Sequence, residues 1–225
     1  MTYPSTVRAR FIERVNRFVA RVDRDGTIET VHVKNTGRLR ELLTPGADVV
    51  LAVSDNPARK TKYDLIAVYK PGLGLVNIDS QIANDAAAEW LRARYPGAVI
   101  RREVTKGASR FDFCIETDRR TIYLEVKGCT LERDGIARFP DAPTERGVKH
   151  IRELADCVRE GYGACLLFVV QMKGVRCLQP NDETHAAFGA ALREAAAAGV
   201  EVLAVDCLVS ENAIVPDAPV AVDLT

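Results

Sequence analysis

Two acids and a lysine fall on one face of a predicted β-hairpin. Apolar and polar residues alternate on both sides of the polar segment around Asp118-Arg119, which is the pattern of two antiparallel strands joined by a tight turn. If these two residues form the loop, position i lies opposite position 237 − i. Asp112 then faces Glu125, and Arg110 faces Lys127. This face of the hairpin therefore carries two carboxylates and two cations.

The pairing of Asp112 with Glu125 predicts that a cation lies beside them. Side chains directly opposite on one face of an antiparallel pair lie about 5 Å apart, and like charges at that distance repel. One interpretation is an ion-pair ladder in which Arg110 and Lys127 compensate the acids. The other is a site for Mg²⁺ or Mn²⁺, which prefer hard oxygen ligands, with Lys127 beside the metal. The hairpin alone does not decide between these interpretations.

A helix predicted at residues 79–95 adds a third acid. Glu89 follows the apolar Ile82 by seven residues, which places it about 20° away in helical projection and inside the apolar stripe. We expect Glu89 to face the sheet and to share a cation with Asp112 and Glu125. The alternative is a glutamate that reaches solvent from the edge of the stripe.

The rest of the pattern predicts two domains. Residues 1–74 have the pattern of four or five short strands, which fits a small closed β-barrel of the OB type. From residue 75 to residue 225 the expected order is helix, three strands, helix, strand, helix and strand, which is an α/β domain with a mixed sheet under helices. The apolar run at 165–171 predicts a strand that is buried on both faces. The expected fold class of the whole chain is α+β.

Composition narrows the possible functions. The 225 residues carry 31 basic and 31 acidic side chains, so any nucleic-acid binding must come from local basic patches. No apolar run is long enough to cross a membrane, and the N-terminus lacks the apolar block of a signal peptide. The six cysteines form no CxxC pair and the three histidines no metal-ligand spacing. We therefore expect reduced thiols, no zinc, no nucleotide cofactor and a cytoplasmic location.

Local basic clusters are the candidates for contact with nucleic acid. Three cations beside Tyr63 in a barrel loop are placed to meet a phosphate backbone while the ring stacks on a base, with a solvated turn as the alternative. Three more basic residues stand at the start of a predicted helix, whose free N–H groups favour a phosphate, with a solvated helix start as the alternative. The predicted nucleic-acid contacts are Arg38, Arg59, Lys60, Lys62, Arg110, Arg146, Lys149 and His150.

Several motifs together resemble the sugar fermentation stimulation protein family, over nearly the whole chain. They are Asn35-Thr36-Gly37-Arg38, Thr44-Pro45-Gly46, Asn84 with Glu89, Ser109-Arg110-Phe111-Asp112-Phe113, Glu125-Val126-Lys127, Thr130-Leu131 and the long segment from Phe139-Pro140-Asp141 to Gly147-Val148-Lys149-His150. Within this set, Asp112 with Glu125-Val126-Lys127 is similar to the core motif of the PD-(D/E)-x-K nucleases.

The resemblance implies an OB-like domain followed by a restriction-endonuclease-like domain. It also implies a DNA-binding protein tied to the expression of sugar-utilisation genes, such as those for maltose. The implied metal ligands are Asp112, Glu125 and Glu89, and the implied catalytic residues are these acids and Lys127.

Three functions follow from these patterns. The first is a Mg²⁺-dependent nuclease, and the second is a non-catalytic DNA-binding regulator whose acids are structural. The third is an interaction protein in which the acids hold a stabilising ion. Two segments depart from the family pattern: Lys34 replaces a frequent proline, and Ala83-Asn84-Asp85 replaces a frequent Pro-Asn-Arg, which exchanges a cation for an acid. Neither change affects the three acids or Lys127.

Overall fold

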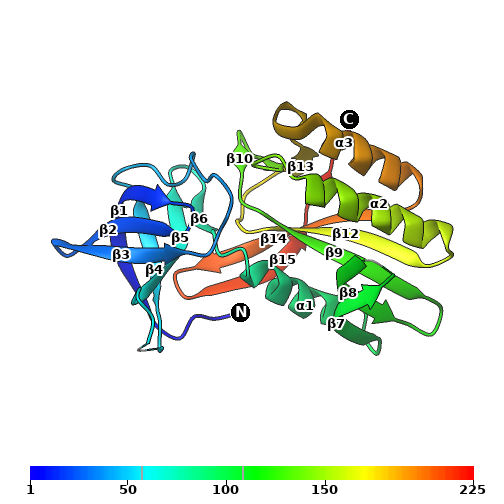
Figure 1. The fold of residues 1–225 in the computed structure, drawn as a ribbon, viewed down its shortest axis with the longest axis horizontal. Coiled ribbons are helices and arrows are strands. Elements are labelled where there is room, and N and C mark those ends of the chain that lie inside the picture. Colours follow the sequence, from blue (N-terminus) through cyan, green and yellow to red (C-terminus); the bar gives the residue numbers. More distant parts are fainter. Residues whose placement is uncertain (57, 108) are drawn as a thin grey trace.

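A closed β-barrel forms the first part of the chain (Figure 1). The structure is a computed structural model that describes residues 1–56, 58–107 and 109–225. Its strands are β1 (Thr6–Asn16), β2 (Val19–Arg24), β3 (Thr27–Val33), β4 (Asp48–Val53), β5 (Tyr63–Lys70) and β6 (Gly74–Asn77). The antiparallel order is β3-β2-β1-β4-β5-β6, and a parallel pairing of β3 with β5 closes the barrel. The tight β2–β3 turn uses Asp25 and Gly26 at positive φ, where glycine is tolerated without strain.

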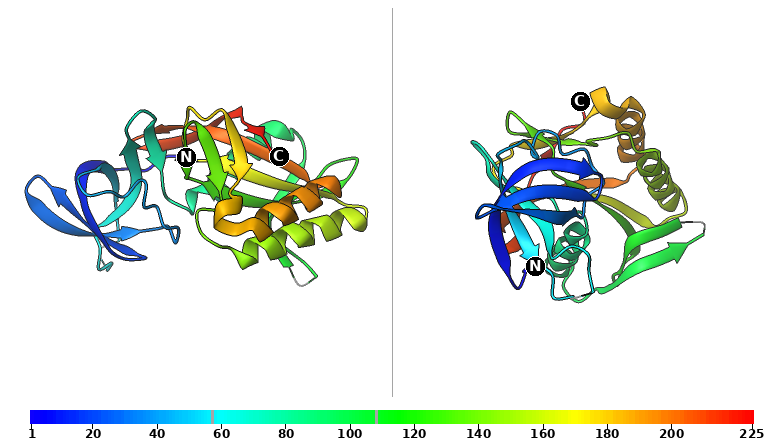
Figure 2. Two further views of the ribbon diagram at one scale, coloured as in Figure 1. Left: turned by 90° about the horizontal axis from the view of Figure 1, so that it is seen from above. Right: turned by 60° about the vertical axis from the view of Figure 1, so that its left-hand side comes forward.

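A second domain follows, built on a six-stranded sheet in the order β15-β14-β12-β9-β8-β7. Its elements are α1 (Ile82–Arg94), β7 (Val99–Lys106), β8 (Ser109–Glu116), β9 (Thr121–Cys129), α2 (Glu145–Arg159), β12 (Gly163–Val170), α3 (Asp182–Ala197), β14 (Glu201–Ser210) and β15 (Ala213–Pro219). Helix α1 packs on one face of the sheet, while α2 and α3 cover the other (Figures 1 and 2). A small second sheet contains β10 (Glu132–Arg133), β11 (Ile136–Phe139), β13 (Cys177–Pro180) and β16 (Ala221–Val222).

The expected α+β class, with a barrel before a helix-covered mixed sheet, is confirmed. Strand β12 is buried along its whole length, as its apolar run predicted. The sheet that includes β10 and β11 was missed, because these strands are short and lie in a segment with turn residues. Strand β6 extends the barrel sheet to Asn77, and α1 begins at Ile82; the boundary between residues 74 and 75 stays a prediction. Among the described residues, no helix is long and apolar enough to cross a membrane.

The central hairpin has the predicted register. Phe113 pairs with Leu124, and Glu116 pairs with Thr121, so that position i lies opposite 237 − i. The Thr117 N–H donates to the Arg120 carbonyl oxygen at 3.1 Å and closes the turn. The ladder ends at the Phe113 pair, one residue before Asp112. The two acids therefore lie where β8 and β9 separate.

Strand β8 changes face at Asp112. The β7–β8 ladder skips the pair between Glu103 and Asp112, and Glu103 has φ 56°, which distorts the strand there. Phe111 consequently packs against Tyr123 with a ring distance of 5.2 Å and belongs to the core beneath α2. Phe113 belongs to the core beneath α1. Phe111 and Phe113 therefore lie on different faces of the sheet, although strict alternation along a strand would place both on one face.

Candidate metal centre at the strand ends

Asp112 is held in place by groups of two different elements. The backbone N–H of Val126 on β9 donates to its Oδ2 at 2.8 Å, and Nδ2 of Asn84 on α1 donates to its Oδ1 at 3.0 Å. The Asp112 carboxylate thus accepts the Val126 N–H in place of a backbone carbonyl oxygen, next to the last pair of the β8–β9 ladder. Each of its oxygens has a second lone pair that these hydrogen bonds leave free.

Glu125 is buried, with 4% of the residue exposed. Its Oε1 accepts a hydrogen bond from Nζ of Lys127 at 2.7 Å and also contacts Nδ1 of His150. No described residue donates to Oε2 of Glu125. One oxygen of this carboxylate is therefore occupied by two protein groups, and the other is available to a ligand.

Helix α2 carries His150 to the centre. Its first turn is capped by Thr144, whose Oγ1 accepts the N–H of Gly147 at 3.1 Å, and such a cap stabilises a helix start. One turn on, Nε of Arg146 donates to Nε2 of His150 at 3.3 Å. Because Nε2 accepts there, the ring proton lies on Nδ1 and is donated to Glu125. The motif Glu125-Val126-Lys127 and the motif segment 139–150 are thus joined by the hydrogen bond between His150 and Glu125.

The two acids respond oppositely to this environment. Burial, and then the charge of Glu125, raise the pKa of Asp112 above its ordinary value. Burial alone would also raise the pKa of Glu125, but the hydrogen bond from His150 and the charge of Lys127 outweigh it, and the pKa lies below the ordinary value. Asp112 is therefore the carboxylate whose charge is incompletely compensated within the protein.

Glu89 is not brought to this centre. Its side chain is 47% exposed, and Oε2 lies 3.3 Å from the N-terminal amine of Met1. The expectation that it faces the sheet was wrong, because the buried stripe of α1 runs along Ile82, the alanines and Leu91. The residue of α1 that reaches the acids is Asn84. Within residues 1–56, 58–107 and 109–225, no three His, Cys, Asp or Glu side chains gather as a metal-binding group.

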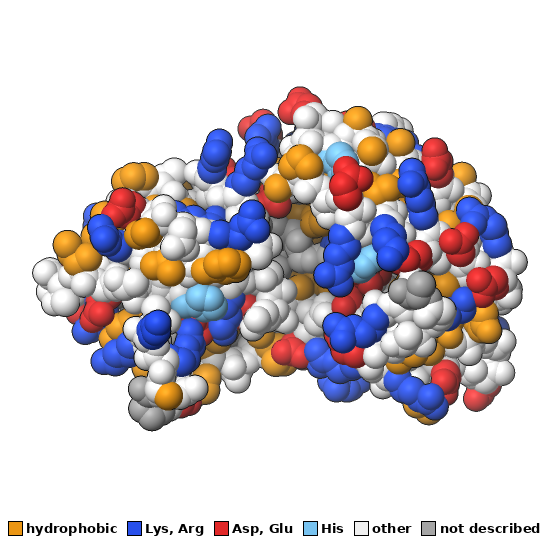
Figure 3. All heavy atoms as spheres, viewed as in Figure 1, with side chains coloured by type: hydrophobic (Ala, Val, Ile, Leu, Met, Phe, Trp, Pro, Cys, Tyr) orange, Lys and Arg blue, Asp and Glu red, His pale blue; other side chains and the backbone are white. Residues whose placement is uncertain are grey.

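The predicted basic contacts divide into engaged and exposed side chains. Arg59 is bound to Asp64, with Nη1 and Oδ2 3.0 Å apart, and Arg110 lies 2.9 Å from Glu103. Lys149 is exposed and pairs with the partly buried Glu153. Arg38, Lys60, Lys62 and Arg146 are also exposed, and Arg146 donates to His150. Lys and Arg side chains stand on both sides of the hollow between the two domains (Figure 3).

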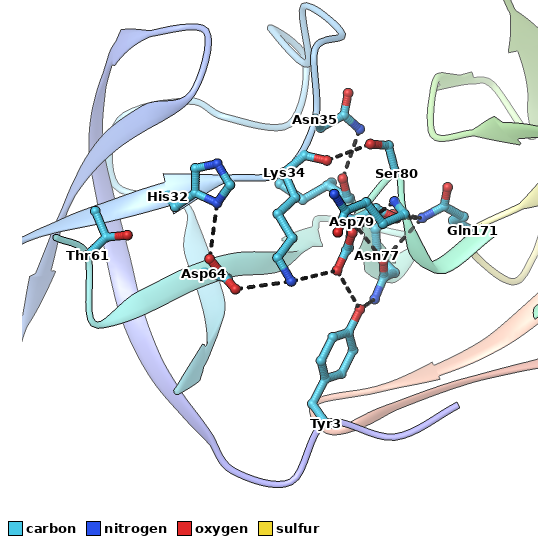
Figure 4. A network of polar contacts seen from close by, with 12 residues as sticks. Tyr3, His32, Lys34, Asn35, Thr61, Asp64, Asn77, Asp79, Ser80 and Gln171 are labelled. Atoms are coloured by element: carbon cyan, nitrogen blue, oxygen red, sulfur yellow. Dashed lines mark hydrogen bonds and ion pairs between the residues drawn. The ribbon is translucent and has the colours of Figure 1, made fainter. Parts of the chain in front are cut away.

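A buried polar network fixes the barrel against the sheet domain (Figure 4). Lys34 lies 3.0 Å from Asp64 and 3.5 Å from Asp79, and the Tyr3 hydroxyl donates to Asp79 at 3.5 Å. On the other side, Nε2 of Gln171 donates to the Asp79 carbonyl oxygen at 3.0 Å. Burial would raise the pKa of Asp64, but Arg59 and Lys34 hold it at about 2. Through Asp79, the network joins Lys34 of the barrel to Gln171 of the sheet domain.

Several of these residues escaped the sequence reasoning. Asn84 was quoted as part of a motif without a role, and its polarity within an alanine-rich helix was the available signal. Gln171 ends an apolar strand run, and a buried amide at a strand end usually has a partner to bind. Nothing in the spacing of Asp64 and Asp79 relates them to Lys34, because three separate elements bring them together.

Comparison with known proteins agrees with this arrangement. The model of the "Sugar fermentation stimulation protein RE domain" matches residues 81–213, and that of the "SfsA N-terminal OB domain" matches residues 12–78. The sugar fermentation stimulation protein homolog of Clostridium beijerinckii is 51% identical over 217 residues, covering 95% of this chain and 96% of the relative. The homolog of Desulfitobacterium hafniense strain Y51 is 51% identical over 216 residues, covering 95% and 94%.

A solved structure shares the whole fold. Pyrococcus furiosus SfsA, determined in complex with Ca²⁺, superposes with a TM-score of 0.87 at 30% identity, covering 99% of this chain and 98% of that one. The same family is indicated by both family models, by the two relatives that are 51% identical and by this structure. The chain belongs to the sugar fermentation stimulation protein family.

Proposed function

We propose that this protein is a DNA-binding, metal-dependent phosphodiesterase with a nuclease site of the PD-(D/E)-x-K kind. The observation that carries the proposal is the grouping of Asp112, Glu125 and Lys127 where β8 and β9 separate. Two carboxylates and a lysine from one hairpin lie together there, and Lys127 also lines the cleft between the domains. A phosphate that contacts Lys127 in this cleft would lie next to Glu125, whose Oε1 is 2.7 Å from the Lys127 Nζ.

The residues present fit a divalent cation. Mg²⁺ is commonly held by one or two carboxylates while it keeps several waters, and Asp112 and Glu125 supply that number. Oε2 of Glu125 is free of donors among the described residues, and the raised pKa of Asp112 marks a charge that a cation would compensate. The Ca²⁺ in the Pyrococcus furiosus relative supports a divalent site in the family. We expect Mg²⁺ or Mn²⁺ here, held by Asp112 and Glu125 without Glu89.

When bound, the metal would supply Lewis-acid chemistry and lower the pKa of a bound water. Lys127 would orient the attacking water and compensate the charge of the phosphate, since its Nζ is held 2.7 Å from Glu125 and the residue lines the cleft. His150 would keep Glu125 in one rotamer, with its own ring fixed by Arg146. Each role uses a contact that the free protein already makes.

Exposed cations would guide the DNA backbone to this site. Arg146 and Lys149 lie in the first turns of the 15-residue helix α2, where free N–H groups also favour a phosphate. Arg38, Lys60 and Lys62 would extend the contact onto the barrel. Because the chain has no net charge, we expect affinity to fall steeply with salt as these few contacts are screened.

The test is cleavage of fluorescent single-stranded DNA, duplex DNA and RNA with Mg²⁺, Mn²⁺ or Ca²⁺. We expect cleavage with Mg²⁺ or Mn²⁺ that the double variant Asp112→Asn with Lys127→Ala abolishes. Glu116→Gln removes a partly exposed acid from the same hairpin and serves as the matched control. Glu89→Gln should retain activity, since the structure holds Glu89 at Met1. Cleavage that survives in the double variant would refute the assigned site.

One observation favours a second function, a non-catalytic DNA-binding regulator. Glu125 already has two partners, Lys127 and His150, so an ion pair compensates its charge without a metal. Under this alternative the acids only stabilise the fold. DNA binding that persists in the double variant, without cleavage of any substrate by the wild type, would favour it.

A further inference from the structure

A polar cleft lies between the barrel and the sheet domain, next to Lys127. Its volume is about 470 Å³, within the range of roughly 300–1,000 Å³ that is typical of small-ligand sites. One wall is the barrel loop Asn35-Thr36-Gly37, and the other is the segment from Arg138 to Thr144. Both segments belong to the motifs of the family, yet neither contains the nuclease acids.

The barrel wall of the cleft is rigidly built. The guanidinium of Arg14 donates to the carbonyl oxygens of Arg17, Asn35, Gly37 and Arg38, at 2.7 to 3.0 Å. A single side chain thus fixes the path of the loop. Because a glycine at position 37 leaves room, the opposite wall can approach it closely.

The two walls are also fastened to each other. Oδ2 of Asp141 accepts the Arg38 N–H at 2.9 Å. A Cβ at Gly37 would lie 2.2 Å from that oxygen, so the contact requires glycine. The cleft is therefore formed before any ligand arrives, and binding need not order its walls.

At its floor the cleft presents a hydrogen-bond acceptor. Gln171 is 1% exposed, and its Nε2 donates to the Asn77 carbonyl oxygen, to Asn77 Oδ1 and to the Asp79 carbonyl oxygen, at 3.0 to 3.1 Å. Three acceptors around the nitrogen fix the orientation of the amide, and the Gln171 oxygen points away from this network (Figure 4). No described residue donates to Oε1. A Cβ at Gly128 would lie 2.4 Å from it, so the absence of a side chain there leaves the oxygen accessible.

The rim of the cleft is cationic. Arg17 comes from the barrel, while Lys127 and Arg138 come from the sheet domain. The acid of the lining, Asp141, is turned to the Arg38 N–H. Cations at the rim and a fixed acceptor at the floor suit a ligand with a negative group at one end and an N–H donor at the other. A nucleotide has this distribution, with its phosphate outside and its base inside.

We infer that the cleft binds one unpaired nucleotide of the substrate strand, with the base donating to Gln171 and the adjoining phosphates at the rim. The inference rests on the proposed function and specifies its substrate as single-stranded. Every nucleobase has an N–H on its Watson–Crick edge, but in a duplex that edge is occupied by the partner base. A cleft of this volume also has no room for a duplex.

Binding is measured in Ca²⁺ as the anisotropy of a fluorescent 12-nucleotide single strand and of the same strand in a duplex, with competition by dCMP. We expect the wild type to prefer the single strand. Arg138→Ala should weaken single-strand binding about tenfold, the effect of one lost charge-assisted contact, and should change duplex binding much less. Ala142→Trp fills the cleft at constant charge and should reduce both single-strand affinity and competition by dCMP. Arg10→Ala removes an exposed barrel charge that does not line the cleft and is the matched control.

The outcomes separate the inference from the proposed function. Wild-type-like single-strand binding by folded Arg138→Ala and Ala142→Trp would overturn the inference, even if metal-dependent cleavage is found. If both variants lose single-strand binding and dCMP competition while Arg10→Ala does not, the inference stands, even if no substrate is cleaved. A wild type that binds the duplex more tightly than the single strand would also overturn it.

Discussion

The strongest stability prediction concerns Asp64, the acid at the barrel end of the junction network. Only 4% of the residue is exposed, and its pKa lies at about 2, below the ordinary value of 3.8. Burial alone would raise this pKa, but the Arg59 guanidinium and the Lys34 ammonium lower it by more than burial raises it. At about 1.36 kcal/mol per pKa unit, the difference stabilises the folded state by about 2 kcal/mol at neutral pH.

The sign of the pH dependence follows from the depressed pKa. The folded state holds Asp64 ionised more strongly than the unfolded state, so its contribution is complete above about pH 4 and disappears as the pH falls towards about 2. At pH 3 we expect roughly half of it to be lost. Replacing Asp64 with Asn removes this dependence.

The assay is urea unfolding of the wild type and Asp64→Asn between pH 7 and pH 2.5. The difference in unfolding free energy between them should shrink by about 1 kcal/mol from pH 5 to pH 3. Asp25→Asn is the control, since that side chain is 90% exposed and should show no such trend. A wild-type advantage that stays constant, or grows, as the pH falls would refute the reasoning.

Two further predictions concern the acids and the cleft. In the metal-free protein, Glu125→Gln should lower the pKa of Asp112, because it removes the neighbouring negative charge and leaves Lys127 to compensate Asp112; carboxyl ¹³C NMR titration measures this, and an unchanged or higher pKa would contradict it. Gly128→Ala should destabilise the fold by about 1–3 kcal/mol, the usual cost of overpacking, because the new methyl would meet the fixed Gln171 amide; equal melting temperatures for variant and wild type would show that the amide moves freely.

The sequence predicted the parts of the molecule that depend on local pattern. Alternation on both sides of Asp118-Arg119 was enough for the hairpin register, and a continuous apolar run was enough for the buried strand β12. Asp112 and Glu125 could be paired because the register is a matter of counting. That prediction holds up to the end of the ladder.

What could not be predicted depends on distortion and on distant contacts. The missing pair between Glu103 and Asp112 places Phe111 in the core beneath α2. Residue propensities do not predict the positive φ of Glu103. Helical projection put Glu89 within the stripe, but the packing of α1 turns it outward to Met1. The role of Gln171 becomes clear only in the folded protein, where the barrel places Asn77 within hydrogen-bond distance of its amide. Such placements depend on how the two domains meet.

Divalent-metal binding at Asp112 and Glu125 is the property on which the proposed function depends. The direct measurement is the melting temperature during titration with Mn²⁺, for the wild type, Asp112→Asn and Glu116→Gln. A metal at 100 times its Kd stabilises by about 2.7 kcal/mol, which corresponds to roughly 5–11 °C in a chain of this size. We predict this increase for the wild type and Glu116→Gln, and none for Asp112→Asn. An increase that Asp112→Asn retains, or a wild type that does not respond, would contradict a metal site at these acids.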